Sequence, residues 1–144
     1  MSCYECYIKG YTLPELKVGS SAYIVMRDGV VVFSLSKLYA CPETIEPSKF
    51  HFYCELLAAR EALRKCTEKF QVKVYTSEVI VSNWLMHRCK KKEYNEWINV
   101  IKKEFPKHES VEVNYYKNGC NQLLFQDVQD MAYQTTHEYK PTQI

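Results

Sequence analysis

The segment from Glu55 to Leu63, Glu-Leu-Leu-Ala-Ala-Arg-Glu-Ala-Leu, constrains the fold more than any other part of the chain. Apolar residues in and around it recur at intervals of three and four, which predicts one side of a helix packed against a core. They are Phe52, Leu56, Ala59, Leu63 and Cys66. Glu55 lies at the margin of this apolar side. An ionised glutamate is rarely buried without a partner, a metal or a proton, so Glu55 is a candidate functional residue. The alternative is an exposed first-turn glutamate that the helix dipole favours.

The segments on either side of this helix predict a mixed sheet. Residues 4–9, 20–27 and 30–38 are rich in β-branched and aromatic residues, and Asp28-Gly29 between the last two supplies the positive φ angles of a two-residue hairpin. Ser48 is a predicted N-cap for the helix. Residues 72–76 and 111–116 are predicted strands, and further helices are predicted from residue 77 or 78, over 93–105 and from Leu123 to Ala132.

The predicted order of elements, β-β-β-α-β-α-α-β-α, is typical of an α/β fold. It gives a five-stranded mixed sheet, with three antiparallel strands followed by two helix-linked strands, and helices on both faces. If the fourth strand lies beside the first, the ends of these two strands and the start of the Glu55 helix meet at one place. Open α/β sheets keep their functional sites at such places.

Composition indicates one globular domain. The chain has 144 residues, of which we assign 1–133 to the domain and 134–144, which have little apolar content, to a C-terminal tail. It contains no apolar run long enough to span a bilayer and no basic start followed by an apolar segment. We therefore expect a cytoplasmic protein without a membrane partner. Seven cysteines, an odd number scattered through apolar segments, favour reduced thiols.

One basic run stands out in a chain whose net charge is only +2. Arg88, Lys90, Lys91 and Lys92 follow Trp84, and a cluster of cations near an aromatic ring is typical of a phosphate-contacting surface. We therefore predict that these five residues bind nucleic acid. The alternative is a solvated helix end, which is what most charge runs are.

Several of these segments resemble a known family. The stretch from Cys54 to Leu63 is similar to the helix that carries an active-site glutamate in type 1 ribonuclease H. Residues 72–77 look like the strand that follows that helix, and 97–105 with 111–119 resemble the penultimate helix and the fifth strand of that family. The resemblance implies a ribonuclease H-like fold. It also implies cleavage of the RNA strand of an RNA/DNA hybrid by two divalent ions held among clustered carboxylates.

The acidic site of that family is incomplete in this sequence. Glu55 matches the helix glutamate, but Lys9 stands where the first strand carries an aspartate and Ser77 where the fourth strand ends in one. In the last helix, Asp127 and Asp130 are both candidates for the remaining carboxylate. Lys9 places a positive charge where divalent cations would bind, and Ser77 contributes no negative charge.

We therefore predict a ribonuclease H-like domain with a degenerate site, in which the ammonium of Lys9 replaces the metals as counter-charge to Glu55 and to Asp127 or Asp130. No metal cofactor is then expected. The alternative is an active, metal-dependent ribonuclease H with a reduced carboxylate set, in which Glu55 and Asp130 hold Mg²⁺ or Mn²⁺. For the inactive domain two kinds of partner remain open, namely an RNA/DNA hybrid or other nucleic acid, and a protein.

Overall fold

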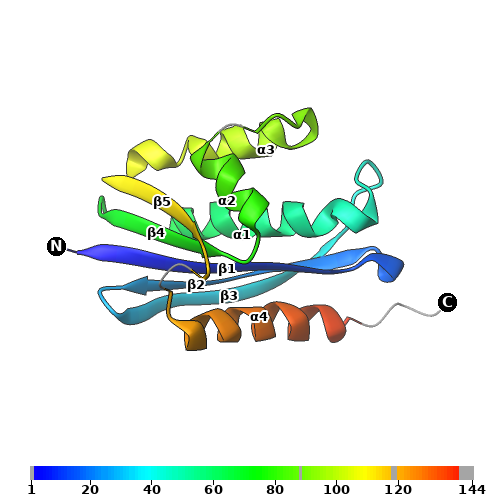
Figure 1. Cartoon of the computed structure of the whole chain (residues 1–144). Coiled ribbons are helices and arrows are strands. Elements are labelled where there is room, and N and C mark those ends of the chain that lie inside the picture. The colour runs from blue at the N-terminus through cyan, green and yellow to red at the C-terminus, as the bar shows by residue number, and fades with distance from the viewer. Residues whose placement is uncertain (1, 88, 118–119, 140–144) are drawn as a thin grey trace.

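A single mixed β-sheet forms the centre of the computed structural model, which describes residues 2–87, 89–117 and 120–139 (Figure 1). Its strands are β1 (Cys3–Leu13), β2 (Val18–Arg27), β3 (Val30–Ala40), β4 (Gln71–Thr76) and β5 (Ser110–Tyr115). They lie in the order β3-β2-β1-β4-β5. The β1–β2 and β2–β3 pairs are antiparallel, whereas β4 runs parallel to both β1 and β5. The predicted meander is confirmed, and β4 lies beside β1, an arrangement that the sequence left conditional.

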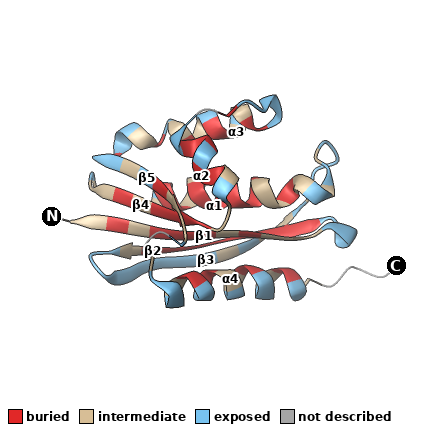
Figure 2. Ribbon diagram, in the orientation of Figure 1, coloured by how far each residue is buried: buried red, intermediate tan, exposed pale blue. Residues whose placement is uncertain are grey.

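Helices cover both faces of this sheet (Figure 1). On one face lie α1 (Phe50–Lys65), α2 (Val79–Met86) and α3 (Lys92–Lys102), and on the other lies α4 (Gln122–His137). Short 3₁₀ helices span Pro14–Leu16, Pro47–Lys49 and Phe105–Lys107. Buried residues are concentrated where the helices face the sheet (Figure 2). The predicted α/β fold class is therefore confirmed. No helix in the described part of the chain is long and apolar enough to cross a membrane.

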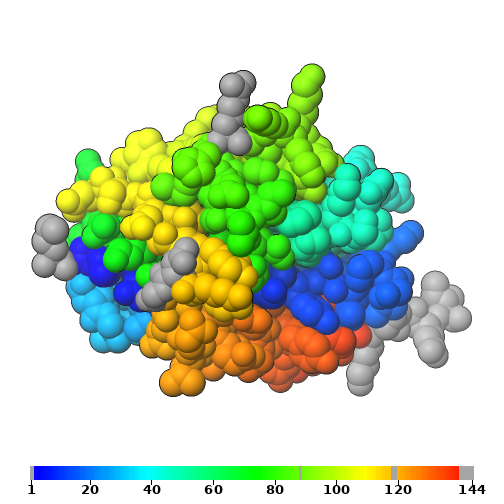
Figure 3. All heavy atoms as spheres, viewed as in Figure 1, coloured from blue at the N-terminus to red at the C-terminus, as the bar shows by residue number. Residues whose placement is uncertain are grey.

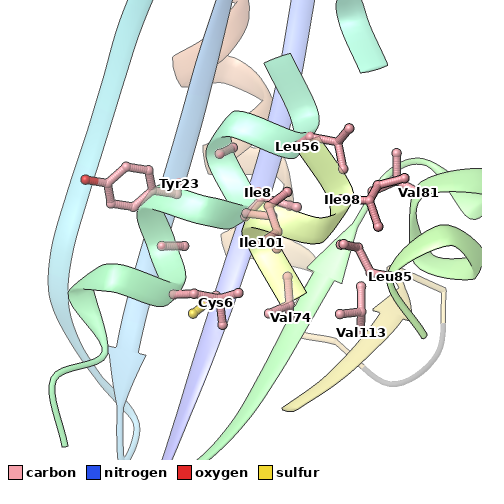
Figure 4. Packing of buried hydrophobic residues seen from close by; sticks show 14 of the residues in the cluster. Cys6, Ile8, Tyr23, Leu56, Val74, Val81, Leu85, Ile98, Ile101 and Val113 are labelled. Atoms are coloured by element: carbon pink, nitrogen blue, oxygen red, sulfur yellow. The ribbon is translucent and has the colours of Figure 1, made fainter. Parts of the chain in front are cut away.

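The two faces of the sheet support separate hydrophobic cores. In the larger core, Ile8 of β1 and Val74 of β4 pack with Leu56 of α1 and with side chains from α2 and α3 (Figure 4). The smaller core, under α4, contains Tyr7, whose ring stacks on Tyr75 with 5.2 Å between the ring centroids. Successive residues of a strand point to opposite faces. Tyr7 and Ile8 therefore join different cores, and β1 anchors both layers of helices.

Gly10 allows α1 to approach β1 closely. A Cβ atom at this position would lie 2.7 Å from the carbonyl oxygen of His51 and 2.8 Å from the carbonyl carbon of Cys54, which is closer than packed atoms come. The strand continues through Gly10 to Leu13, beyond the predicted end at Lys9. The backbone of β1 therefore lies directly against the first turns of α1.

Local signals at the ends of elements were only partly predictive. The hairpin turn is confirmed, because Asp28 has a φ of 49° and Gly29 a φ of 84°. The predicted N-cap at Ser48 is wrong. Ser48 lies within a 3₁₀ helix, and Lys49 precedes α1 without a capping hydrogen bond from its side chain.

The last helix is longer than predicted. α4 continues over residues 134–137, which the sequence assigned to the tail. Buried hydroxyl groups hold this last turn against the sheet, because the Thr136 hydroxyl donates to Ser20 Oγ at 2.7 Å and Ser20 donates to the carbonyl oxygen of Ala132 at 2.7 Å. Polar residues at this end of the helix are therefore part of the packed structure. Residues 140–144 of the predicted tail lie outside the described residues.

Candidate functional site

The carboxylate of Glu55 joins α1 to the ends of β1 and β4. Its Oε1 accepts a hydrogen bond from the backbone N–H of Gly10 at 2.5 Å. Its Oε2 accepts from the hydroxyl of Thr76, from the backbone N–H of Ser77 at 3.0 Å and from the hydroxyl of Ser77 at 3.3 Å. Glu55 is completely buried, with 0% of its surface exposed. The predicted meeting of the two strand ends with this helix is therefore present, and Glu55 is the residue that connects them.

Burial and hydrogen bonding act on Glu55 in opposite directions. Loss of hydration raises the pKa of the Glu55 carboxyl above its usual value, and the nearby charge of Glu78 adds to the rise. The hydrogen bonds from Thr76 and Gly10 and the positive charge of Lys9 lower the same pKa, but the effect of burial is larger. The site therefore favours the neutral carboxyl more than water does.

Lys9 reaches Glu55 through a serine. The ammonium Nζ of Lys9 donates to Ser77 Oγ at 3.2 Å, and Ser77 Oγ donates in turn to Glu55 Oε2. Among the ion pairs of the described residues, Lys9 and Glu55 do not come within 4.0 Å of each other. The structure links the ammonium of Lys9, predicted as a counter-charge to Glu55, to that carboxylate through the hydroxyl of Ser77.

The two aspartates of α4 occupy different places. Asp130 lines a surface hollow that also includes Lys9, and its Oδ1 accepts from Gln126 Nε2 at 3.0 Å. Asp127 is exposed and does not line this hollow. Neither aspartate is hydrogen-bonded to Glu55, whose partners are Gly10, Thr76 and Ser77. Of the two candidates, Asp130 is the one that the fold places beside Lys9.

Comparison with solved structures identifies the architecture. The chain superposes on ribonuclease H1 from the halophilic archaeon Halobacterium salinarum with a TM-score of 0.74 and 9% identity, over 95% of this chain and 99% of the other. Ribonuclease H1 LC11, isolated from compost by a metagenomic approach, gives 0.75 and 9%, over 96% and 98%. The N-terminal ribonuclease H domain of rv2228c from Mycobacterium tuberculosis gives 0.72 and 8%, over 95% of each chain. This protein has the ribonuclease H fold.

Sequence comparison adds nothing to this result, because no protein-family model and no curated protein matches the chain significantly. Within the ribonuclease H fold, the site around Glu55 can therefore be assessed only from its own residues.

These residues do not fit a pair of divalent cations. Hard cations need several oxygen ligands with free lone pairs. Three donors already occupy Glu55 Oε2, a fourth occupies Oε1, and the ammonium of Lys9 is hydrogen-bonded to Ser77, one of these donors. In the described part of the chain, no group of three or more His, Cys, Asp or Glu side chains is placed to share a metal ion.

Trp84 does not belong to the basic surface predicted from the sequence. It is 5% exposed, and its ring stacks on Tyr94 of α3 at a centroid distance of 4.4 Å and meets the ring of Phe52 edge-on at 5.5 Å. The prediction that Trp84 contacts nucleic acid is therefore wrong in this structure. The aromatic ring contributes to the core between α1, α2 and α3, because partners from two other helices enclose it.

The basic run itself lies at the surface. Lys90 and Lys91 are exposed in the loop after α2, and Lys92, also exposed, begins α3. They therefore lie in the connection between α2 and α3 and at the first residue of α3. Arg88 lies outside the described residues.

Sequence reasoning missed the groups that bind Glu55 and the cap of α4. Two of the donors are backbone N–H groups, which the sequence does not display, and Thr76 was assigned only to the strand. Asn121 is the N-cap of α4 and accepts from the N–H groups of Leu123 at 3.0 Å and Leu124 at 3.3 Å. The known preference for Asn at N-caps is the signal that would have found it.

Proposed function

We propose that this protein is a non-catalytic ribonuclease H-like module that binds nucleic acid without a metal ion. The observation that carries the proposal is the state of Glu55, which is fully buried and accepts hydrogen bonds from four donors. A carboxylate in this state joins elements of the fold, and binding a cation would require several of these hydrogen bonds to break. Lys9 beside it would also repel the cation.

The loop between α2 and α3 supports nucleic acid as the ligand. Lys90, Lys91 and Lys92 are exposed there, beside a polar hollow of about 250 Å³ lined in part by His87, Asn99 and Lys102. Lys102 is fixed by its hydrogen bond to the carbonyl oxygen of His87 at 2.7 Å. Exposed ammonium groups in one loop suit phosphates that need no particular base sequence, so binding is expected to weaken as salt rises.

A protein partner is the second candidate, and one specific surface favours it. β3 forms an edge of the sheet and exposes large apolar side chains, among them Val30 at 64%, Leu35 at 50% and Phe33 at 42%. An exposed apolar edge strand can pair with a strand of another protein.

A cleavage assay tests the loss of catalysis. RNA/DNA hybrid is incubated with the wild type and with Glu55→Gln, in Mg²⁺ and separately in Mn²⁺, and the products are separated on a gel. We expect no cleavage by either protein. Cleavage by the wild type that Glu55→Gln abolishes would overturn the proposal and favour an active ribonuclease H with a reduced carboxylate set.

A salt titration tests the ligand. The affinity of the wild type for duplex, hybrid and single strands is compared with that of a variant in which Lys90, Lys91 and Lys92 are all Gln. The control changes three exposed lysines elsewhere, Lys37, Lys69 and Lys103, so that the net charge is the same. We expect the loop variant to lower the salt slope by about 2 to 3, and the control to change it much less. Absence of binding at low salt would contradict nucleic-acid binding and favour the protein partner.

A further inference from the structure

The hollow beside Lys9 has the components of a nucleotide site. It measures about 240 Å³ and lies between the second half of β1, which contributes Lys9 and Tyr11, and α4, which contributes Gln126, Gln129, Asp130 and Tyr133. Figure 3 shows the two elements side by side on the surface, β1 in dark blue and α4 in orange to red. A cation, two amides, a carboxylate and two aromatic rings thus line one hollow, which is separate from the lysines of the loop between α2 and α3.

Tyr133 is an aromatic platform held by its neighbours. Its ring packs against His137 at a centroid distance of 4.0 Å with the ring planes tilted by 34°, and it meets Tyr11 edge-on at 5.3 Å. Tyr11 Oη and His137 Nε2 are hydrogen-bonded at 3.2 Å. Tyr133 nevertheless remains 52% exposed. A ring that is fixed by two neighbours and open to solvent can accept a base by stacking at little entropic cost.

Lys9 supplies the charge for a phosphate. Its ammonium carries three protons, and the hydrogen bond to Ser77 uses one of them. Within the described residues it forms no ion pair with a carboxylate at 4.0 Å or less. Lys9 also lines the hollow, so its remaining donors are available to an anion there.

Asp130 restricts which ligand can bind. Its carboxylate repels a second phosphate but accepts hydrogen bonds from an exocyclic amino group, which cytosine, adenine and guanine carry. Gln126 holds it through the 3.0 Å hydrogen bond. The hollow therefore suits a single nucleotide with an amino-bearing base.

We infer that this hollow binds one nucleotide of a single-stranded nucleic acid without a metal ion, with Lys9 on its phosphate and Tyr133 stacked on its base. The inference rests on the proposed function and adds a second contact, separate from the loop between α2 and α3. A base must leave its duplex to stack on Tyr133, so single strands bind here better than duplexes.

Fluorescence anisotropy with short labelled oligonucleotides in EDTA tests the inference. The probes are oligo(dC), oligo(dT) and an abasic oligonucleotide of the same length. Tyr133→Ala is compared with Leu123→Ala, which removes another exposed side chain of α4, 79% exposed and outside the hollow. We expect Tyr133→Ala to weaken oligo(dC) binding about 5- to 100-fold, Tyr133→Trp to retain it, and Leu123→Ala to leave it unchanged.

Two further comparisons assign the roles. Tyr133→Ala should not change binding of the abasic probe, whereas Lys9→Gln should weaken all three probes. Asp130→Asn should reduce the preference of the wild type for oligo(dC) over oligo(dT). Circular dichroism melts establish whether each variant is folded. If Lys9→Gln is not folded, the binding of Tyr133→Ala alone tests the nucleotide site. Unchanged oligo(dC) binding by folded Tyr133→Ala overturns the inference, as does an equal loss with the abasic probe.

The loop variant separates this inference from the proposed function. If replacing Lys90, Lys91 and Lys92 abolishes binding and Tyr133→Ala does not affect it, the nucleotide site is refuted and the loop surface stands. If Tyr133→Ala weakens binding and the loop variant does not, the nucleotide site is supported and nucleic-acid binding by the loop lysines is refuted. Absence of binding by the wild type refutes both.

Discussion

Two buried glutamates lie near opposite ends of α1, and they differ in their hydrogen-bond donors and in the direction of their pKa shifts. Glu55, in the first turns, is 0% exposed and accepts hydrogen bonds only from uncharged donors. Glu104 is 5% exposed and packs near the last turn of α1, where it binds Arg64 at 3.2 Å and Lys107 at 2.8 Å. Burial raises the pKa of Glu55, whereas the hydrogen bond from Lys107 and then that from Arg64 lower the pKa of Glu104.

The difference shows that uncharged donors of the fold, and not cations, hold the side chain of Glu55. Glu104 is neutralised by cations that reach it from solvent, which is the ordinary way to bury a carboxylate. Among the described residues Glu55 forms no such ion pair, and it depends on donors from Gly10 in β1, from Thr76 in β4 and from Ser77 directly after β4. If these donors replaced the metal ions of a ribonuclease H fold, removing the carboxylate should damage the fold itself.

Removing the Glu55 carboxylate should lower the free energy of unfolding more than any other change considered. Glu55→Leu leaves the backbone N–H groups of Gly10 and Ser77 buried without acceptors, and we expect a loss of about 3 kcal/mol in the free energy of unfolding, measured by urea denaturation. The control Asp130→Leu changes an exposed carboxylate and should alter stability by less than about 0.5 kcal/mol. Equal effects of the two changes would show that the hydrogen bonds to Glu55 contribute little.

Removing the Glu104 charge should have a smaller and salt-dependent effect. The side chains of Arg64 and Lys107 are 46% and 66% exposed, so solvent screens both ion pairs. We expect Glu104→Gln to cost about 1 kcal/mol at low salt and less as salt is added. The cost of Glu55→Leu should not change with salt. A salt-sensitive loss at Glu55 would mean that Lys9 pairs with it directly.

The pH dependence of stability should have opposite signs at the two residues. The folded pKa of Glu55 is raised above 4.5, so its contribution is complete below about pH 4.5 and is lost as pH rises through the folded pKa. The folded pKa of Glu104 is lowered, so its contribution is complete above about pH 4.5 and is lost as pH falls through the folded pKa. With Glu55→Gln and Glu104→Gln as references that do not titrate, urea denaturation between pH 3 and 7 should give opposite slopes. If the stability differences from the two Gln variants changed with pH in the same direction, the opposite pKa shifts of Glu55 and Glu104 would be contradicted.

Local sequence signals predicted the frame of the molecule well. The Asp28-Gly29 turn, the apolar side of α1 and the short strand β4 each follow from neighbouring residues. The place of β4 beside β1 does not, because it depends on contacts between distant segments. Trp84 was grouped with the basic run because it lies just before that run in the sequence, and only the packing of α2 against α3 brings its ring against Tyr94.

The sequence was sufficient to select the residues of the site, but not to predict the hydrogen bonds that they form. Glu55, Lys9 and Ser77 were selected together, and the structure places them in one hydrogen-bonded chain. The hydrogen bond from Gly10 to Glu55 depends on the close approach of α1 to β1 at Gly10, which no pattern in the sequence displays. Tyr133 and His137 were missed for the same reason, because their pairing with Tyr11 joins residues far apart in the chain.

The effect of metal on unfolding tests the role of Glu55 most directly. Urea denaturation of the wild type and of Glu55→Gln is measured in EDTA and in saturating Mg²⁺ or Mn²⁺. A ligand that binds the folded state must stabilise it. We predict that Glu55→Gln is less stable than the wild type by the same amount in every condition, because Gln can replace only one of the two accepting oxygens. A metal-dependent gain in stability that the wild type shows and Glu55→Gln lacks would contradict the account.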